Sequence, residues 1–309
     1  MDVASASGSG YADGMTQTRP NVDTPRGFGF ALSAYLLWGF LPLYMKALSA
    51  VPVAEVIAHR ILWSVPVAGL VLVWLGRTAE LRAALRTPRM LAMGAVTAAL
   101  ITINWGIYVW AIQSGHALEA ALGYYINPLF SVFLGAVLLK ERLSLAQKLA
   151  IGLAALAVVV LTVEAGQVPV VALGLTVSWG AYAYFKKMLP IGPNQGFMLE
   201  VLILSPFALG YLLWRGMSGA VFVADGGTVA LLLGAGVVTA VPLMLYANGA
   251  KLLKLSTIGI LQYVAPTMIF LTAVFLFGEP FGMARAIAFP MIWAALAIYT
   301  VSLLRGARR

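Results

Sequence analysis

The amino-acid sequence predicts an all-α membrane protein in which ten transmembrane helices form two inverted repeats of five helices each. Three observations support this fold class: the composition, the regular recurrence of long apolar segments, and a similarity between the two halves. Hydrophobic residues make up 61% of the 309 residues, charged residues only 10%, and the mean hydropathy is +0.93. Because a soluble domain has about 25% charged residues, this chain is predicted to lie in a bilayer.

The chain begins with a polar segment. Residues 1–26 are rich in Ser, Gly, Asp and Thr and contain no apolar run. Such a composition cannot form a packed core, so a disordered cytoplasmic tail is expected there. The apolar run that follows is too long for the hydrophobic region of a signal peptide, and it is expected to remain as the first membrane helix.

Ten apolar segments of about 20 residues follow, each long enough to cross about 30 Å of hydrocarbon. The predicted helices are 27–48, 52–75, 90–113, 117–138, 144–164, 168–189, 196–215, 228–250, 255–277 and 284–304. The first five form one repeat, residues 27–164, and the last five form the second, residues 168–304. The joints near 49–51, 114–116 and 165–167 are short, which predicts tight helical hairpins.

Lysine and arginine are distributed unevenly between the segments that join the helices. If the N-terminus is cytoplasmic, only Lys46, Arg215 and Arg285 fall in outer segments and only Arg60 lies within a span. Positively charged loops stay on the cytoplasmic side, so both termini, including residues 305–309, are predicted to be cytoplasmic. Membrane orientation also accounts for the net charge of +9, and we expect no nucleic-acid partner.

The two halves repeat each other at an offset of 138 to 141 residues. Trp38-Gly39 in the first segment corresponds to Trp179-Gly180 in the sixth. Tyr125-Ile126-Asn127-Pro128 in the fourth segment corresponds to Tyr263-Val264-Ala265-Pro266 in the ninth. An odd number of helices per half inverts the second half relative to the first, and such inverted repeats are typical of alternating-access carriers.

Few ionisable residues lie within the predicted spans, and each is a candidate for function because its burial in hydrocarbon is costly. The second segment carries Glu55, His59 and Arg60, and the first two are four residues apart and could pair. Glu119 lies near the outer end of the fourth segment. These side chains are predicted to line a cavity, where Arg60 binds a carboxylate and Glu or His exchanges protons. Alternatively, Glu55 lies at the outer interface and the other two tie helices together.

Polar and aromatic residues of four segments are predicted to form the wall of a pocket for an organic solute. This set consists of Asn104, Trp105, Tyr108, Tyr124, Tyr125, Gln262 and Tyr263, with Asn127, Tyr246 and Asn248 as further candidates in the same segments. An interfacial aromatic belt combined with hydrogen bonds between helices is the alternative, and it is the interpretation we adopt for Trp110. Pro128 and Pro266, at matching places in the two halves, are predicted to be paired hinges.

The motifs of membrane-embedded enzymes are absent from the sequence. It has no HExxH pattern, no Gly-rich phosphate loop, no Asp-rich pair and no cysteine, and neither His belongs to a metal-ligand cluster. We therefore expect no enzymatic activity, no cofactor and no metal site. A channel is still an open alternative, although scattered single charges suit a carrier better than a filter.

The sequence resembles RarD-type proteins of the EamA family, in the drug/metabolite transporter superfamily. The motifs that carry the resemblance are Ala34-Tyr35, Trp38-Gly39, the stretch Glu55 to Ser64, Asn104-Trp105, Leu118-Glu119-Ala120, Gln262-Tyr263 and Pro266-Thr267. The resemblance covers nearly everything from residue 27 to 304, and it implies a ten-helix transporter of the inner membrane.

We therefore expect a secondary transporter that exports a small zwitterionic or anionic solute, such as an amino acid or related metabolite, by alternating access. Its partners are the solute and the lipid bilayer, with protons as a candidate coupling ion through Glu55, His59 or Glu119. Two alternatives stay open: efflux of a chloramphenicol-type drug, and a membrane accessory protein that modulates drug sensitivity without transport.

Overall fold

A computed structural model describes residues 24–138, 143–218, 225–250, 252–253, 257–258 and 261–306. Within these ranges the chain forms only helices, so the predicted all-α class is confirmed. The elements, in order, are α1 (Pro25–Ala47), α2 (Val53–Trp74), α3 (Ala79–Leu85), α4 (Pro88–Gln113), α5 (Ala117–Leu138), α6 (Leu145–Ala165), α7 (Val170–Met188), α8 (Pro193–Met217), α9 (Gly226–Ala250), α11 (Val264–Leu271), the π-helical η1 (Thr272–Leu276) and α12 (Met283–Gly306).

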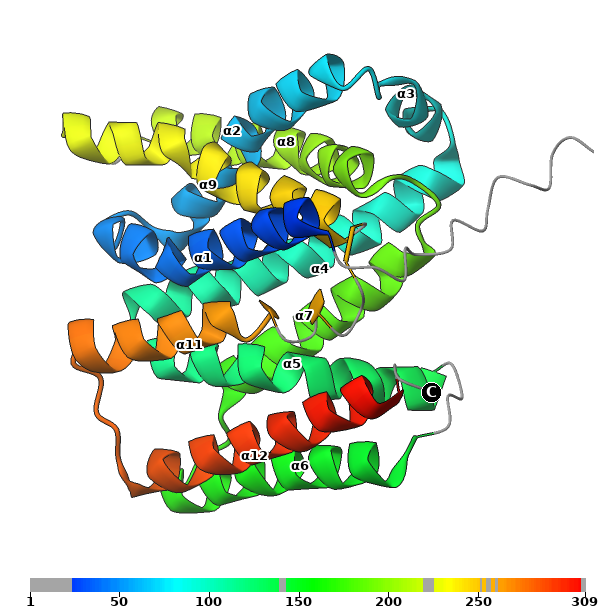
Figure 1. The fold of residues 1–309 in the computed structure, drawn as a ribbon. Helices are drawn as coiled ribbons and strands as arrows, with labels where there is room; N and C mark the ends of the chain where they lie inside the picture. Colours follow the sequence, from blue (N-terminus) through cyan, green and yellow to red (C-terminus); the bar gives the residue numbers. More distant parts are fainter. Residues whose placement is uncertain are drawn as a thin grey trace, which may run out of the picture.

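Eight of these helices are long and apolar enough to cross a membrane: α1, α2, α4, α5, α6, α8, α9 and α12. Two further elements lie among them in the bundle of roughly parallel and antiparallel helices (Figure 1). One is α7, which carries Thr176, Ser178 and Lys186, and the other is the shorter apolar segment Val264–Leu276. Most of the tail predicted at 1–26 lies outside the described residues, and its last two residues belong to α1.

Local sequence signals explain where several helices begin and end. Thr24 caps α1, because its hydroxyl accepts a hydrogen bond from the Gly27 amide at 3.0 Å and Pro25 occupies the first turn. Ser144 and Gln147 form a capping box at the start of α6. Gly115 and Gly166, with φ of +79° and +65°, turn the chain between α4 and α5 and after α6. The predicted short connections are therefore present.

Two elements differ from the predicted helices. The short helix α3 lies in the connection between α2 and α4, where no helix was expected. The segment predicted as one helix over 255–277 is interrupted: residues 257–258 and 261 are helical, a turn follows at 262–263, and α11 and η1 continue from residue 264. Pro266 explains this break, because a proline lacks the N–H that would donate to the carbonyl four residues earlier, at residue 262.

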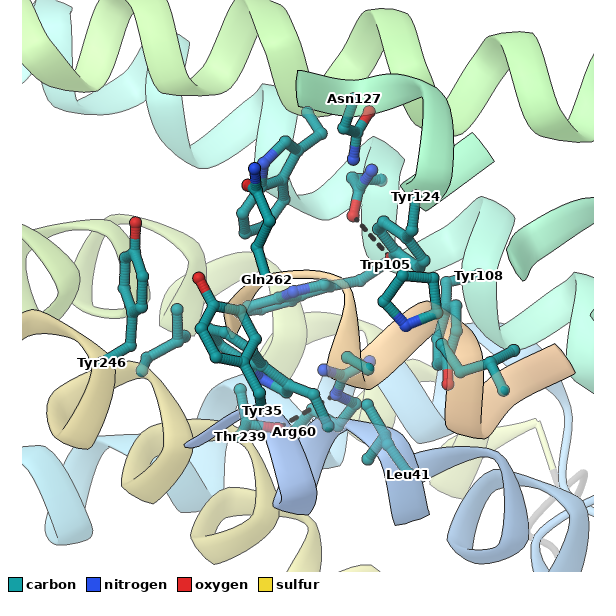
Figure 2. A pocket seen from close by; sticks show the side chains of 17 residues that line it. Tyr35, Leu41, Arg60, Trp105, Tyr108, Tyr124, Asn127, Thr239, Tyr246 and Gln262 are labelled. Carbon is teal, nitrogen blue, oxygen red and sulfur yellow. Dashed lines mark hydrogen bonds between the residues drawn. The ribbon is translucent and has the colours of Figure 1, made fainter. Parts of the chain in front are cut away.

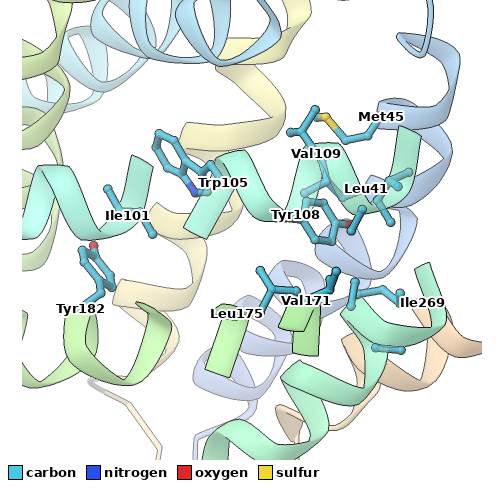
Figure 3. Packing of buried hydrophobic residues seen from close by; sticks show 14 of the residues in the cluster. Leu41, Met45, Ile101, Trp105, Tyr108, Val109, Val171, Leu175, Tyr182 and Ile269 are labelled. Atoms are coloured by element: carbon cyan, nitrogen blue, oxygen red, sulfur yellow. The ribbon is translucent and has the colours of Figure 1, made fainter. Parts of the chain in front are cut away.

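The principal helix contacts link the two halves of the chain. α1 packs on α9 and α11, α2 on α8 and α9, α4 on α7 and α8, α5 on α7 and α11, and α6 on α12. Figure 3 shows α4 in the middle of this packing, with Tyr108 and Val109 beside Leu41 of α1. Gly236 permits the closest approach, since a Cβ there would overlap the backbone of α2.

Large apolar side chains cover the outside of the bundle. Leu70, Trp74, Phe207, Phe275 and Val163 are each at least 72% exposed. A soluble monomer rarely exposes apolar patches of this extent, whereas a lipid-facing surface consists of such side chains. The protein is therefore a multi-pass membrane protein.

Candidate functional site

A cavity of about 140 Å³ lies in the centre of the bundle. Its walls come from α1, α2, α4, α5, α7, α9 and the segment 262–269 (Figure 2). The lining residues are Tyr35, Trp38, Leu41, Arg60, Asn104, Trp105, Tyr108, Tyr124, Asn127, Trp179, Thr239, Leu243, Tyr246, Gln262, Ala265, Pro266 and Ile269. The lining is thus aromatic and polar, with one cationic side chain.

Arg60 is held at the cavity wall by α2. The residue is only 3% exposed, its Nε donates a hydrogen bond to the Thr239 hydroxyl at 3.0 Å, and its guanidinium lies over the Trp105 ring at 4.7 Å. In the described part of the chain Arg60 forms no ion pair, and its Nη1 has no hydrogen-bond partner. A buried guanidinium with a free donor attracts an anion, and a carboxylate matches its geometry.

Two further polar atoms of the cavity are buried without a hydrogen-bond partner among the described residues: the Tyr108 hydroxyl and the Asn127 Oδ1. Figure 2 places Tyr108 beside Arg60 and Asn127 on the opposite side of the cavity. Buried polar groups normally have partners, because an unsatisfied one costs free energy. Their convergence on one cavity therefore favours a ligand-binding role.

Asn104 organises the wall between these groups. Its Nδ2 donates to the Leu175 carbonyl at 3.2 Å and to the Ser178 hydroxyl at 3.0 Å, both on α7. Its Oδ1 accepts from the Tyr124 hydroxyl at 3.4 Å. These bonds tie α4 to α7 and hold the Tyr124 ring in place, so Asn104 is a structural part of the wall.

Aromatic rings form the other side of the cavity. Tyr35, Trp38 and Tyr246 contact each other with centroid distances of 5.6 to 5.8 Å, and Tyr124 meets Trp179 edge to face. Contacts of this kind fix the orientation of the rings. The surface suits the apolar part of a small organic solute.

Six of the predicted binding residues line this cavity: Arg60, Asn104, Trp105, Tyr108, Tyr124 and Gln262. Glu55 does not, because its carboxylate accepts a hydrogen bond from the Arg215 Nε of α8 at 2.7 Å. Neither does His59, whose Nδ1 accepts from the Trp63 indole at 3.0 Å. The pairing of Glu55 with His59 that the sequence allowed is not among the ion pairs of the described residues, in which Glu55 pairs with Arg215.

The remaining predicted residues also lie elsewhere. Glu119 lines a separate cavity of about 310 Å³ with His116 and Arg285. The Tyr125 hydroxyl pairs with the Thr267 hydroxyl at 2.7 Å, and its ring packs on Phe289. Tyr263 is partly buried and does not line the central cavity.

The matched prolines occupy different backbone settings. Pro128 lies inside the continuous helix α5, whereas Pro266 lies in the first turn of α11 and lines the cavity. Interior prolines also occur in α1, α2, α8, α9 and α12. An interior proline therefore does not distinguish α5 from the other helices, and the hinge role of Pro128 and Pro266 stays a prediction.

Two cavity residues, Asn127 and Tyr246, were further candidates in the sequence, whereas Tyr35, Trp38, Trp179 and Thr239 were not predicted. Trp38 and Trp179 had a signal in the sequence, since they are the matching tryptophans of the two halves. No group of three or more His, Asp or Glu that could hold a metal occurs in the described part of the chain.

A bundle of apolar helices around a small aromatic and polar cavity defines a membrane protein that can hold a solute within the bilayer. Comparison with known proteins identifies the group. The EamA-like transporter family matches residues 25–163. The chain belongs to this family, in the drug/metabolite transporter superfamily, and is a transporter of the RarD type.

The relatives match over almost their whole length. "Protein RarD" of Streptomyces exfoliatus is 42% identical, with 92% of this chain and 90% of that protein covered. "Uncharacterized transporter YojE" of Bacillus subtilis is 41% identical, over 93% of this chain and 98% of that protein. "Chloramphenicol-sensitive protein RarD" of Pseudomonas aeruginosa is 31% identical, over 88% and 93%.

A solved crystal structure resembles this fold with a TM-score of 0.59 at 22% identity, and the match covers 89% of this chain and 96% of that chain. At this identity the likeness concerns the fold alone.

Proposed function

We propose that the protein is a secondary carrier of the inner membrane that binds a small carboxylate-bearing organic solute in the central cavity and exports it from the cytoplasm by alternating access. The observation that carries the proposal is Arg60, a buried guanidinium that faces the cavity and forms no ion pair within the described ranges. A solute carboxylate is the natural partner of such a group. The chain is proposed to have no enzymatic activity.

Ten spanning helices in two inverted halves are part of this proposal. The proposed relation between the halves exchanges corresponding helices: α1 with α7, α2 with α8, α4 with α9, α5 with α11 and α6 with α12. Under this exchange the contact of α1 with α9 corresponds to the contact of α7 with α4. The same exchange relates the contact of α2 with α9 to that of α8 with α4, and the contact of α5 with α7 to that of α11 with α1. These matching contacts support a pseudo-two-fold relation.

Individual residues support the same relation. A Cβ added to Gly39 of α1 would meet Met268 of α11, and one added to Gly180 of α7 would meet Phe130 of α5. The two glycines are 141 residues apart and their contacts are 138 apart, which are the offsets of the sequence repeat. The cavity lies between the halves, as alternating access requires, and rocking about Pro128 and Pro266 is the proposed motion.

Both termini are proposed to be cytoplasmic. The start of α1 and the end of α12 lie at the same end of the bundle (Figure 1). Basic residues occur near this end of the helices, in the α2–α4 connection and at the ends of α7 and α12, which supports a cytoplasmic orientation.

Two other candidate functions have weaker support. A relative carries the printed name "Chloramphenicol-sensitive protein RarD", which keeps drug efflux as a candidate. The cavity volume of about 140 Å³ is close to that of an engineered cavity that accepts benzene, and chloramphenicol is several times larger. An accessory protein that binds without transport would give no reason for an arginine at mid-membrane.

Uptake by proteoliposomes tests these alternatives. The panel contains amino acids, small carboxylic acids and chloramphenicol, each measured with and without a pH gradient. Arg60→Ala is expected to abolish uptake of the transported carboxylate. Unchanged uptake by this variant would contradict the proposed site, and binding without accumulation would favour the accessory role. Uptake that is insensitive to the gradient would remove protons as the coupling ion.

A further inference from the structure

The charge of the cavity restricts the class of solute further. Seventeen residues line the cavity, and Arg60 is the only charged one among them (Figure 2). The nearby acidic side chains are engaged elsewhere: Glu55 with Arg215 and Glu200 with Lys186. The described part of the cavity therefore carries one positive charge and no negative charge.

A low-dielectric cavity penalises any charge that lacks a counter-charge. A monoanionic solute brings one carboxylate to Arg60 and leaves the pair neutral. A zwitterionic amino acid also brings a carboxylate, but its ammonium group then lacks a carboxylate on the wall. Aromatic faces compensate a cation only in part, and in the T-shaped contacts of Tyr35 with Trp38 and with Tyr246 the edge of one ring covers a face of the other.

The second polar end of the cavity suits a neutral group. Asn127, 7% exposed on α5, has a side-chain oxygen without a partner in the described chain, and it lies across the cavity from Arg60 (Figure 2). A primary amide presents both an acceptor and donors, and a hydroxyl can donate and accept. A hydroxyl on the solute therefore satisfies Asn127 without adding a charge.

Given the carrier proposed above, on which this step rests, we propose that its solute is a small monocarboxylate with a neutral hydrogen-bonding group, of the 2-hydroxy acid class, rather than a zwitterionic amino acid. Arg60 binds the carboxylate and Asn127 binds the neutral group. The cavity volume of about 140 Å³, close to that of an engineered cavity that binds benzene, favours a small solute.

The test compares isosteric pairs that differ only in a hydroxyl or an ammonium group. Counterflow of radiolabelled lactate, alanine, 2-hydroxyisovalerate and valine is measured at neutral pH, with Arg60→Met proteoliposomes as the background for passive leak. Each hydroxy acid is expected to be transported at least about tenfold faster than its amino acid. Equal or faster transport of the amino acids would overturn this inference and leave the proposed carrier intact.

Asn127→Leu supplies the matched control, because it keeps the branching and the number of side-chain heavy atoms and removes the polarity. This variant is expected to slow lactate counterflow by about tenfold and to leave propionate, which lacks the hydroxyl, unchanged. Equal slowing of both acids would overturn the role of Asn127. If wild-type protein moves none of the acids above the Arg60→Met background, both the solute class and the proposed carrier are wrong.

Discussion

Buried charges at the ends of the helices and the buried charge in the central cavity have different surroundings. At the ends, Glu55 pairs with Arg215 at 2.7 Å, and Glu200 pairs with Lys186 at 2.6 Å. In the centre, Arg60 has a hydroxyl and an aromatic face as partners but no carboxylate among the described residues. The charges at the ends hold helices together, whereas the charge in the centre has no protein counter-charge in the described chain and is available to a ligand. Burial alone does not distinguish these two roles, because both kinds of charge are buried.

The most completely satisfied charge at a helix end is Glu279. Its two carboxylate oxygens accept hydrogen bonds from the backbone amides of Ala117 and Leu118, at 2.6 and 2.9 Å. These amides are at the N-terminus of α5, where the helix leaves N–H groups without partners and carries partial positive charge. A residue of the second half thereby caps a helix of the first half.

Glu279→Ala is expected to have the largest effect on stability. It removes both acceptors from two buried amides, and each hydrogen bond to a charged group contributes about 1.5 kcal/mol or more, so the expected loss is about 3 kcal/mol. The measurement is the temperature at which purified protein in detergent loses its monodisperse elution peak. Glu279→Gln, which keeps one amide oxygen, is expected to lose about half as much. An unchanged midpoint in both variants would show that the cap contributes nothing.

The pair between Glu55 and Arg215 should show a smaller effect. Arg215→Met leaves the buried Glu55 carboxylate without its cation, but the Arg215 side chain is 24% exposed and water screens the loss. We expect a destabilisation of about 1 kcal/mol in the same assay. The double variant Glu55→Gln with Arg215→Met should recover most of it. Additive losses in this cycle would mean that the two residues are not coupled.

Arg60→Met should lower stability less than Arg215→Met, although Arg60 is the more deeply buried of the two arginines. Its substitution leaves no carboxylate unpaired in the described chain, and methionine fills the same space without a charge to desolvate. The expected change in the unfolding free energy is below about 1 kcal/mol, while uptake of the carboxylate is lost. A loss as large as that of Arg215→Met would identify Arg60 as a structural residue.

The helices and Arg60 could be predicted from the sequence because both depend on local information. A run of about 20 apolar residues spans a membrane by length alone, and a single arginine within such a run is conspicuous. The partner of Glu55 could not be predicted, because Arg215 is 160 residues away and the pairing depends on the rotation of two helices.

The aromatic lining was predicted only in part, because the rotation of each helix is not known from its sequence. Tyr35 and Trp38 lie on the cavity side of α1, but aromatic residues also occur on the lipid side, where Trp63 and Trp74 are exposed. Composition does not distinguish these two faces. The break at 262–263 was not predicted, because the segment as a whole is apolar enough to span a membrane and only Pro266 signals the interruption.

His59→Ala should have the smallest effect of all. The imidazole is partly exposed, lies outside the cavity lining, and accepts one hydrogen bond from Trp63, which is 37% exposed. A hydrogen bond at such a position contributes less than about 0.5 kcal/mol, so stability and uptake should both stay near wild type. Uptake is measured across a series of pH gradients, with His59→Gln as the polar control. If His59→Ala abolished the response to the gradient while His59→Gln kept it, a polar group at this position would be needed for coupling outside the cavity. The location of a charged or titratable residue, at a helix end or in the central cavity, would then no longer distinguish structural residues from residues needed for transport.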